Sequence, residues 1–251
     1  MAFLHGKGIS VLANDVNLSS FLNDVSMSSS FETAETTAFG DSAKTYIVGL
    51  GDGSVSLNGM YEGTATTGFD AAVTAAVASS NEVTTSVFYG TPAAGVRTSM
   101  AGGIVTSYEI STPVSDVVSA SLEIQADGGV TQGDALSALT AISATVDATA
   151  ATAVDRGAGA SNTAGTCVAH LHVVANSRDA GTLTAKIVDC DTSGGTYADV
   201  TGGGFTAVSG GSTGSQRLEI SGAVDRFVKV VYTVASGSSG TYTPIVTLSK
   251  Y

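Results

Sequence analysis

The chain has 251 residues, enough for one large domain or two of ordinary size, and we expect two. Only 13% of the residues are charged, so Ser, Thr, Gly and Asn must supply much of the surface. The 10 basic and 22 acidic residues give a net charge of -12, which argues against a protein that reads nucleic acid, because phosphate contacts need Lys and Arg.

The first predicted strand is the Ser-rich segment Phe21–Phe31. Its region carries little charge that would oppose pairing along a strand edge, and serines fill it: Ser19, Ser20, Ser26, Ser28, Ser29 and Ser30. The next segment, Ile47–Leu57, places Asp52-Gly53 between two apolar-rich runs, and this dipeptide predicts a hairpin turn. Apolar and polar residues alternate both after that turn and in Val118–Ile124, which predicts two strands with one buried face.

One short helix is predicted at about residues 68–79. Apolar side chains recur there at spacings of four in an alanine-rich segment: Phe69, Val73 and Val77. Asp70 lies in the first turn, where a negative charge suits the helix dipole. Residues 79–81, Ser-Ser-Asn, end the pattern before a strand at Thr85–Tyr89.

Turn residues cluster at Gly128–Gly133, and we place a domain boundary near residue 132. Short strands separated by Gly, Ser and Thr follow, which favours a β-sandwich. They are Val168–Val174, Leu183–Val188, Leu218–Ile220, Phe227–Val234 and Tyr242–Leu248.

The negative charge is concentrated in the first half. Residues 1–132 contain 13 acidic and 3 basic residues, whereas residues 133–251 contain 9 and 7, so the net charges are -10 and -2. Such a field suits a surface that repels phosphate, and an ordinary solvated acidic surface fits the asymmetry equally well.

Neither secretion nor membrane insertion is expected. The segment Met1–Lys7 has no apolar stretch behind a basic patch and no small-residue cleavage site. No apolar run approaches the ~20 residues of a membrane helix. We expect the chain to be soluble or part of an assembly.

Two histidines and two cysteines are the candidates for chemistry. His170 and His172 project from one face of a predicted strand and could share a metal, but no third ligand is marked, so solvent-facing side chains are favoured. Cys167 and Cys190 bracket a possible hairpin at Ser177–Gly181. Because side chains alternate along a strand, the two sulfurs would point to opposite faces of the hairpin if its strands pair without a bulge. Free thiols are therefore expected.

No catalytic, cofactor-binding or metal site is predicted. The segments Gly202–Phe205 and Gly210–Gly214 lack the Lys-Ser/Thr ending of a phosphate loop and are predicted to be turns. There is no Gly-x-Ser-x-Gly elbow, and no residue stands out as a nucleophile or base, so we expect no enzyme activity.

Three segments resemble the major tail tube proteins of long-tailed, siphovirus-like phages: Tyr46–Gly63, the short helix that follows it, and Ile104–Val118. The opening is similar too, with Ile9–Leu12 and Asp15 leading into the Ser-rich strand and then the polar stretch Glu32–Lys44. The resemblance covers roughly residues 5–132. It implies an all-β tail-tube-type sandwich or barrel domain at 1–132, with one flanking helix.

The same resemblance implies hexameric rings whose inner strands close a continuous barrel, stacked into a tube that conducts DNA. The implied partners are copies of the chain, tape-measure protein, and terminator and baseplate proteins, while DNA passes without specific binding. The implied location is the virion tail, after assembly in the host cytoplasm. The stretch Glu32–Lys44 would contact neighbouring subunits or rings. A contractile-tail tube is structurally close, and only a sheath partner separates the two.

The second half resembles a β-sandwich appended to phage tail and head proteins. The resemblance rests on Leu183–Asp191, Thr196–Val200 and Arg226–Tyr232. It implies an immunoglobulin-like sandwich at 133–251 on the tube exterior.

Two other functions stay open. A capsid decoration or fibre protein, or a carbohydrate-binding module, also fits an all-β chain, although the lack of Trp and an aromatic content of 6% weaken sugar binding. A β-sandwich hydrolase would need two carboxylates meeting in a cleft, and the short predicted loops offer little to build one.

Overall fold

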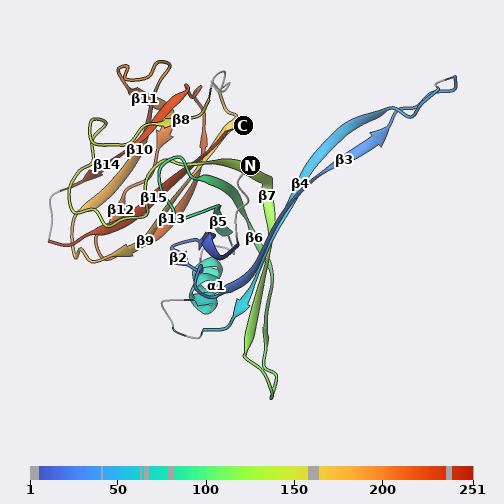
Figure 1. Ribbon diagram of the computed structural model, residues 1–251, viewed down its shortest axis with the longest axis horizontal. Helices are drawn as coiled ribbons and strands as arrows, with labels where there is room; N and C mark the ends of the chain where they lie inside the picture. The colour runs from blue at the N-terminus through green and yellow to red at the C-terminus, as the bar shows by residue number, and fades with distance from the viewer. Residues whose placement is uncertain are drawn as a thin grey trace.

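The computed structural model describes residues 6–40, 42–62, 64, 68–78, 82–157, 164–235 and 239–250. Within them the chain is all-β with one α-helix, as predicted, and its strands form a ten-stranded and a five-stranded antiparallel sheet (Figure 1). None of the described helices is long and apolar enough to span a membrane.

The elements follow in chain order. They are η1 (Gly6–Gly8), β1 (Ser10–Ala13), β2 (Val16–Asn17), β3 (Leu22–Glu35), β4 (Tyr46–Met60), α1 (Gly68–Ala78), β5 (Glu82–Phe88), β6 (Arg97–Ser111), β7 (Ser119–Ala135), β8 (Val154–Asp155), β9 (Cys167–Asn176), β10 (Thr182–Cys190), β11 (Ala198–Gly204), β12 (Val208–Ser209), β13 (Gly214–Ile220), β14 (Phe227–Val234) and β15 (Tyr242–Ser249).

Four long strands lie side by side in the order β3-β4-β7-β6, and each is antiparallel to its neighbour. The β3–β4 hairpin extends far beyond the body as an arm, and the tip of the β6–β7 hairpin projects at the opposite end (Figure 1). The Ser-rich strand and the strand at 118–124 are confirmed as β3 and the first part of β7.

The predicted hairpin turn at Asp52-Gly53 is wrong. Both residues lie within β4, opposite Ser30 and Ser29 of β3, and the two strands are joined only beyond the end of β3 at Glu35 and before the start of β4 at Tyr46. Gly53 serves a close approach, because a Cβ placed on it would lie 3.1 Å from the backbone nitrogen of Val130. The glycine of this dipeptide is therefore explained by the close approach of a neighbouring strand and not by a turn.

Strand β7 joins the two halves of the chain. Residues 119–125 pair with β4, and residues 133–135 pair with β15. Between them Gly128 and Gly129 have φ angles of 76° and 77°, and the register with β6 shifts there. The predicted cluster of turn residues therefore bends the strand without ending it. The boundary near residue 132 stays a prediction, and β7 crosses that position.

The C-terminal half is a β-sandwich. Its five-stranded sheet, ordered β11-β10-β14-β8 with β12 beside β10, faces β13-β9-β15 of the larger sheet across a buried apolar core. All five predicted strands of this half are present. The glycine segment at 202–204 was predicted to be a turn, and this prediction is wrong. The segment is the end of β11, where the register with β10 shifts. The segment from Gly210 does form a turn before β13.

Three apolar clusters hold the fold. One fills the C-terminal sandwich, and a second packs the long strands against α1 through Phe69, which is fully buried. The helix matches the predicted 68–79 closely, although residues 79–81 lie outside the described part. The third cluster is small and bridges the halves: Leu12, Phe88, Ala135 and Ile245.

Candidate functional site

The four long strands have one buried and one solvent-facing side. In the β4–β7 ladder, Leu57 lies opposite Leu122 on the buried side, and both are fully buried. Ser56 lies opposite Glu123 on the other side. Since side chains alternate along a strand, this register assigns each residue between the register shifts of β3 and β6 to one side or the other.

The solvent-facing side is made mostly of serines, amides and carboxylates, and we call it the serine–acid face. Its polar members are Asp24, Ser26, Ser28, Ser30, Asp52, Ser54, Ser56, Asn58, Ser107, Glu109, Ser111, Ser119, Ser121, Glu123 and Gln125. Two exposed apolar side chains, Met60 and Ile104, lie on the same side, opposite Ser119 and Gln125. The four strand segments that carry these residues contain no Lys or Arg. The face is therefore negative and offers no cation to a phosphate.

Hydrogen bonds within the serine–acid face occupy its amide donors. Asn58 Nδ2 donates to Ser56 Oγ at 3.0 Å, and Ser56 Oγ donates to Glu123 Oε1 at 2.6 Å. Gln125 Nε2 donates to the Gly53 carbonyl at 2.9 Å and to the Asp52 carboxylate. Both amides use donors within the face, and the only charged side chains among its members are carboxylates.

Two strand edges flank this face without a partner in the described part of the chain. Strand β3 pairs only with β4, so its outer edge is free along its length. Strand β5 pairs with β6 only as far as Ile104, so residues 105–111 of β6 are free on that side. Free edges of this length that carry no Lys or Arg are sites where another chain can add a strand.

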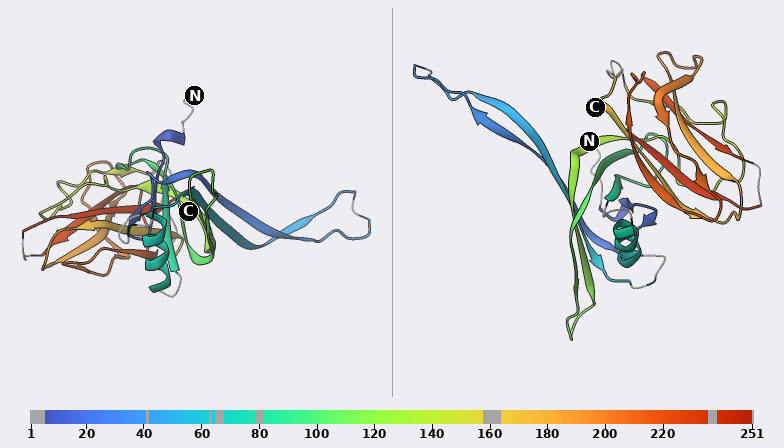
Figure 2. Two further views of the ribbon diagram at one scale, coloured as in Figure 1. Left: turned by 90° about the horizontal axis from the view of Figure 1, so that it is seen from below. Right: turned by 180° about the vertical axis from the view of Figure 1, so that it is seen from behind.

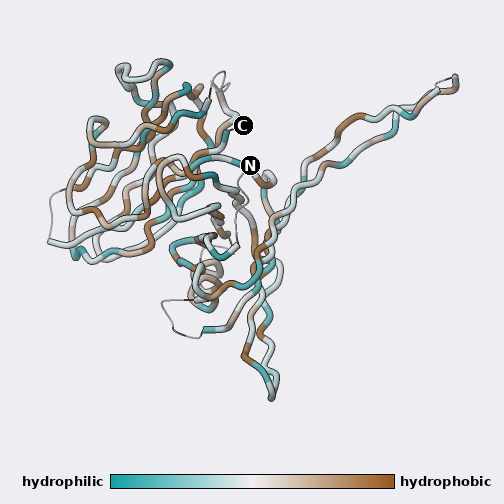
Figure 3. Tube along the Cα trace, in the orientation of Figure 1, coloured by the Kyte–Doolittle hydropathy of each residue, from teal (hydrophilic) through white to brown (hydrophobic). Residues whose placement is uncertain are grey.

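The arm carries apolar side chains that touch little of the protein itself. Leu50 is 79% exposed and Phe31 is 64% exposed, and apolar segments recur along the arm (Figure 3). The whole set is Phe31, Phe39, Tyr46, Ile47, Val48 and Leu50. A projecting apolar surface of this kind is typical of proteins that bind another molecule there.

The interpretation of His170 and His172 as solvent-facing is wrong. They are 1% and 0% exposed, because the side of β9 opposite its sandwich core packs against β1 and β5. Ser86 Oγ lies 3.2 Å from His170 Nδ1 and 2.8 Å from His172 Nε2, and His172 Nδ1 lies 2.6 Å from the Asn14 carbonyl oxygen. The alternation of side chains correctly predicted that both histidines lie on one side of β9. It could not show that other strands cover both sides of β9.

Burial lowers the pKa of both histidines. The pKa of His172 falls to about 4, and that of His170 falls well below 6.5, with further lowering by its neighbours His172 and Arg217. Both rings are therefore neutral at pH 7. Within the described residues no three ligating side chains gather around a possible metal. Ser86 and His172 pair as a hydroxyl and a base, but a substrate has no access to them.

Cys167 and Cys190 are buried and free. The hairpin predicted between them is wrong, because β9 belongs to the ten-stranded sheet and β10 to the five-stranded one. The Cys190 thiol donates to the Thr192 carbonyl at 3.1 Å.

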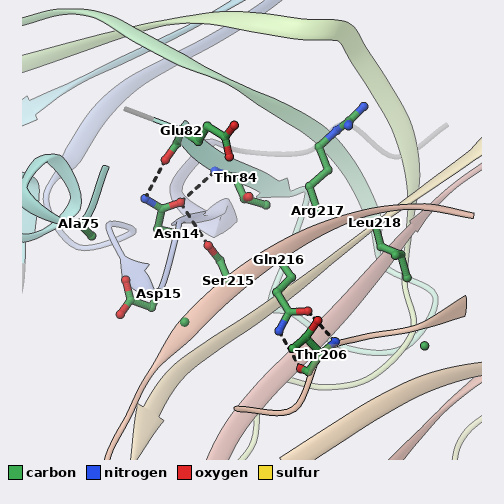
Figure 4. A pocket seen from close by; sticks show the side chains of 12 residues that line it. Asn14, Asp15, Ala75, Glu82, Thr84, Thr206, Ser215, Gln216, Arg217 and Leu218 are labelled. Atoms are coloured by element: carbon green, nitrogen blue, oxygen red, sulfur yellow. Dashed lines mark hydrogen bonds between the residues drawn. The ribbon is translucent and has the colours of Figure 1, made fainter. Parts of the chain in front are cut away.

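A cleft opens between the two halves, lined by β5 on one side and β11 and β13 on the other (Figure 4). Its polar side chains bond to one another. Asn14 Oδ1 accepts from the Thr84 backbone and from Ser215 Oγ, while Gln216 exchanges two hydrogen bonds of 2.8 Å with the Thr206 backbone. The Ser215–Asn14 bond joins the two halves across the cleft, and together these hydrogen bonds leave the named groups unavailable to a ligand.

No protein-family model matches the chain, and no curated protein matches it. Similar solved structures include the tail of an empty gene transfer agent particle with C6 symmetry, at 14% identity and a TM-score of 0.40, covering 52% of this chain and 98% of that one. The SPP1 tail tube has 12% identity and a TM-score of 0.44, with coverages of 52% and 78%. The SPP1 Dit protein has 12% identity and a TM-score of 0.32, with coverages of 96% and 98%. At TM-scores below 0.5 these likenesses assign no function, which has to come from the geometry of the strands.

Proposed function

We propose that the chain is a non-enzymatic structural subunit of a phage-type tail, whose copies form hexameric rings that stack into a tube, with the serine–acid face lining the bore. One observation carries the proposal. A solvent-facing sheet surface without any cation lies between two unpaired strand edges, so that side-by-side copies would join their surfaces into one continuous wall.

The direction of the strands supports ring closure. In the order β3-β4-β7-β6 the strands alternate, so β6 of one copy runs antiparallel to β3 of the next. Repetition therefore extends one antiparallel sheet through every copy without a change in pairing type. Closing the ring removes both edges, which in an isolated subunit would favour aggregation.

The size of the closed sheet fits a channel. Six copies of four strands give 24 strands, which at a spacing of about 4.8 Å and a tilt of about 40° close with a backbone diameter of about 50 Å. Half that number of strands would close at about 25 Å, and side chains would then fill most of the bore. A ring of six leaves room for duplex DNA, and the carboxylates would repel its phosphates so that it passes without specific binding.

The remaining parts of the chain take outer positions in this assembly. Helix α1 and the C-terminal sandwich both lie on the side of the long strands away from the serine–acid face (Figures 1 and 2). We therefore place the sandwich at 133–251 on the tube exterior. The apolar arm would contact neighbouring subunits or the next ring. Tape-measure, terminator and baseplate proteins would be the other partners, in a virion tail assembled in the host cytoplasm.

Reversing charge on the serine–acid face should make assembled tubes retain DNA. Asp52→Lys with Glu123→Lys changes four charges per chain on the two central strands, so the pairing edges stay intact. Affinity for duplex DNA at low salt is expected to rise at least tenfold and to fall steeply with added salt, as counterion release requires. Filter binding across a salt series measures both.

The matched control for this reversal is Asp179→Lys with Asp191→Lys, which makes the same charge change at exposed positions of the sandwich. If both double variants bind DNA equally, net charge alone explains the effect, and the serine–acid face does not line the bore.

A further inference from the structure

A buried chain of polar groups crosses the seam between the two halves, which we define as the contact of β9, β13 and β15 with β1 and β5. The Asn14 carbonyl can only accept, so the proton on His172 lies on Nδ1. His172 Nε2 therefore accepts from the Ser86 hydroxyl, and Ser86 Oγ in turn accepts from His170 Nδ1. The bond from Ser86 requires a neutral His172, because an imidazolium has no nitrogen left to accept a hydrogen bond.

Protonation would break the chain at its centre. A proton on His172 Nε2 turns that nitrogen from an acceptor into a donor, so Ser86 would accept from both rings and lose the acceptor for its own proton. Both rings are fully buried, and the new charge would have no water around it. A buried, unpaired charge of this kind is strongly destabilising.

The elements around the pair carry few charged side chains. They are Asp15 beyond β1, Glu82 on β5, and Arg217 and Glu219 on β13, while β15 carries none. Arg217 disfavours charge on His170 and pairs with Glu219 at 2.8 Å. Burial lowers the pKa of His172, and the bond to Asn14 and the Asp15 carboxylate oppose that shift only in part.

The seam can open without dissolving either half. The sandwich and the long strands have separate apolar cores, and among the apolar clusters of the described residues only the small one around Phe88 and Ile245 spans the seam. Local opening units of a protein follow such divisions between cores. The β7–β15 pairing and the covalent chain would keep the halves together.

We infer that the seam is an acid-sensitive hinge, in which charging of His170 and His172 undocks the C-terminal sandwich from β1 and β5 while β7 keeps the two halves joined.

The sign and size of the effect follow from linkage. The pKa of His172 is about 4 in the closed seam and 6.5 when the ring is in water, so its contribution is complete above pH 6.5 and is lost as the pH falls toward 4. Between pH 7 and pH 4.5 His172 alone should raise the ratio of open to closed seams about 50-fold. His170 acts in the same direction.

Hydrogen exchange of the full-length chain at pH 7 and pH 4.5 tests this inference. Protection factors, corrected for the intrinsic rate at each pH, are compared for peptides of the seam strands β1, β5 and β9 and for reference peptides of β4 and β14. The expected result is a loss of protection of about 50-fold or more in the seam peptides beyond any loss in the reference peptides. An equal loss in both sets would overturn the inference, because acid would then act on the whole fold.

Two variants and a control assign the effect to the histidines. His172→Gln introduces an amide that can hydrogen-bond but cannot titrate. The acid-induced loss of protection in the seam peptides should then shrink to the part that His170 causes. Ser86→Ala keeps both titrating rings and breaks the chain between them, so the seam should be less protected at pH 7 and still acid-sensitive. His5→Gln removes the third histidine of the sequence and should change nothing. Full acid sensitivity in His172→Gln, or its loss in His5→Gln, contradicts the hinge.

Discussion

Phe88→Ala should cost about 3–5 kcal/mol of unfolding free energy, the typical loss for a fully buried phenylalanine whose site cannot collapse. Phe88 lies in the cluster that joins β1 and β5 to β7 and β15, so its loss weakens the contact between the halves and leaves each larger core intact. For a chain of this size the thermal midpoint should fall by about 6–20 °C. Differential scanning calorimetry measures the shift and shows whether the halves still unfold together.

The matched control for Phe88 is Phe31→Ala on the arm, where the side chain is 64% exposed. This change should leave the unfolding free energy within about 0.5 kcal/mol of the wild type. Because the arm is proposed to contact neighbouring copies, it should instead reduce assembly. If the two alanine variants were equally destabilised, Phe88 would not hold the halves together as the structure indicates.

A proline on the outer edge of β3 should abolish ring formation without unfolding the subunit. Ser28 and Ser29 are both exposed, and the N–H groups of successive strand residues point to opposite sides, one toward β4 and the other toward the free edge. Proline removes the N–H and is tolerated only on an edge. One of Ser28→Pro and Ser29→Pro should therefore keep the wild-type thermal midpoint and yet remain monomeric.

The other of the two proline variants serves as the control. It removes a hydrogen bond of the β3–β4 ladder, so it should destabilise the arm. Sedimentation velocity gives the assembly state of each variant, and thermal unfolding gives its stability. Rings formed by both variants at wild-type concentration would show that the β3 edge is not the contact between subunits.

Local patterns predicted most of the strands and the helix. Alternation identified the strand at 118–124, and the spacing of Phe69 and Val73 identified α1, because both signals come from burial of one side of one element. The Asp52-Gly53 pair misled because a glycine needed for close approach of two strands has the same sequence signature as a glycine in a turn. Only the pairing partner, which is distant in sequence, separates the two cases.

Only parts of the serine–acid face could be predicted from the sequence. The alternation of Ser54, Ser56 and Asn58 was recognisable, but their alignment with Glu123 and with β3 depends on register between strands far apart in the chain. The burial of His172 was likewise beyond prediction, because a strand in a sandwich normally has one covered face and β9 has two. Its partner, Asn14, lies 158 residues away along the chain.

Electron microscopy of the purified full-length chain, at a series of concentrations, shows whether its copies assemble into a tube. We expect sixfold rings with an open centre, stacking into hollow tubes, with the C-terminal sandwich as a knob on the outer wall. A chain that stays monomeric at the highest concentration, or that forms small oligomers without a channel, would contradict this expectation. Binding to capsids or glycans would then be the next function to examine.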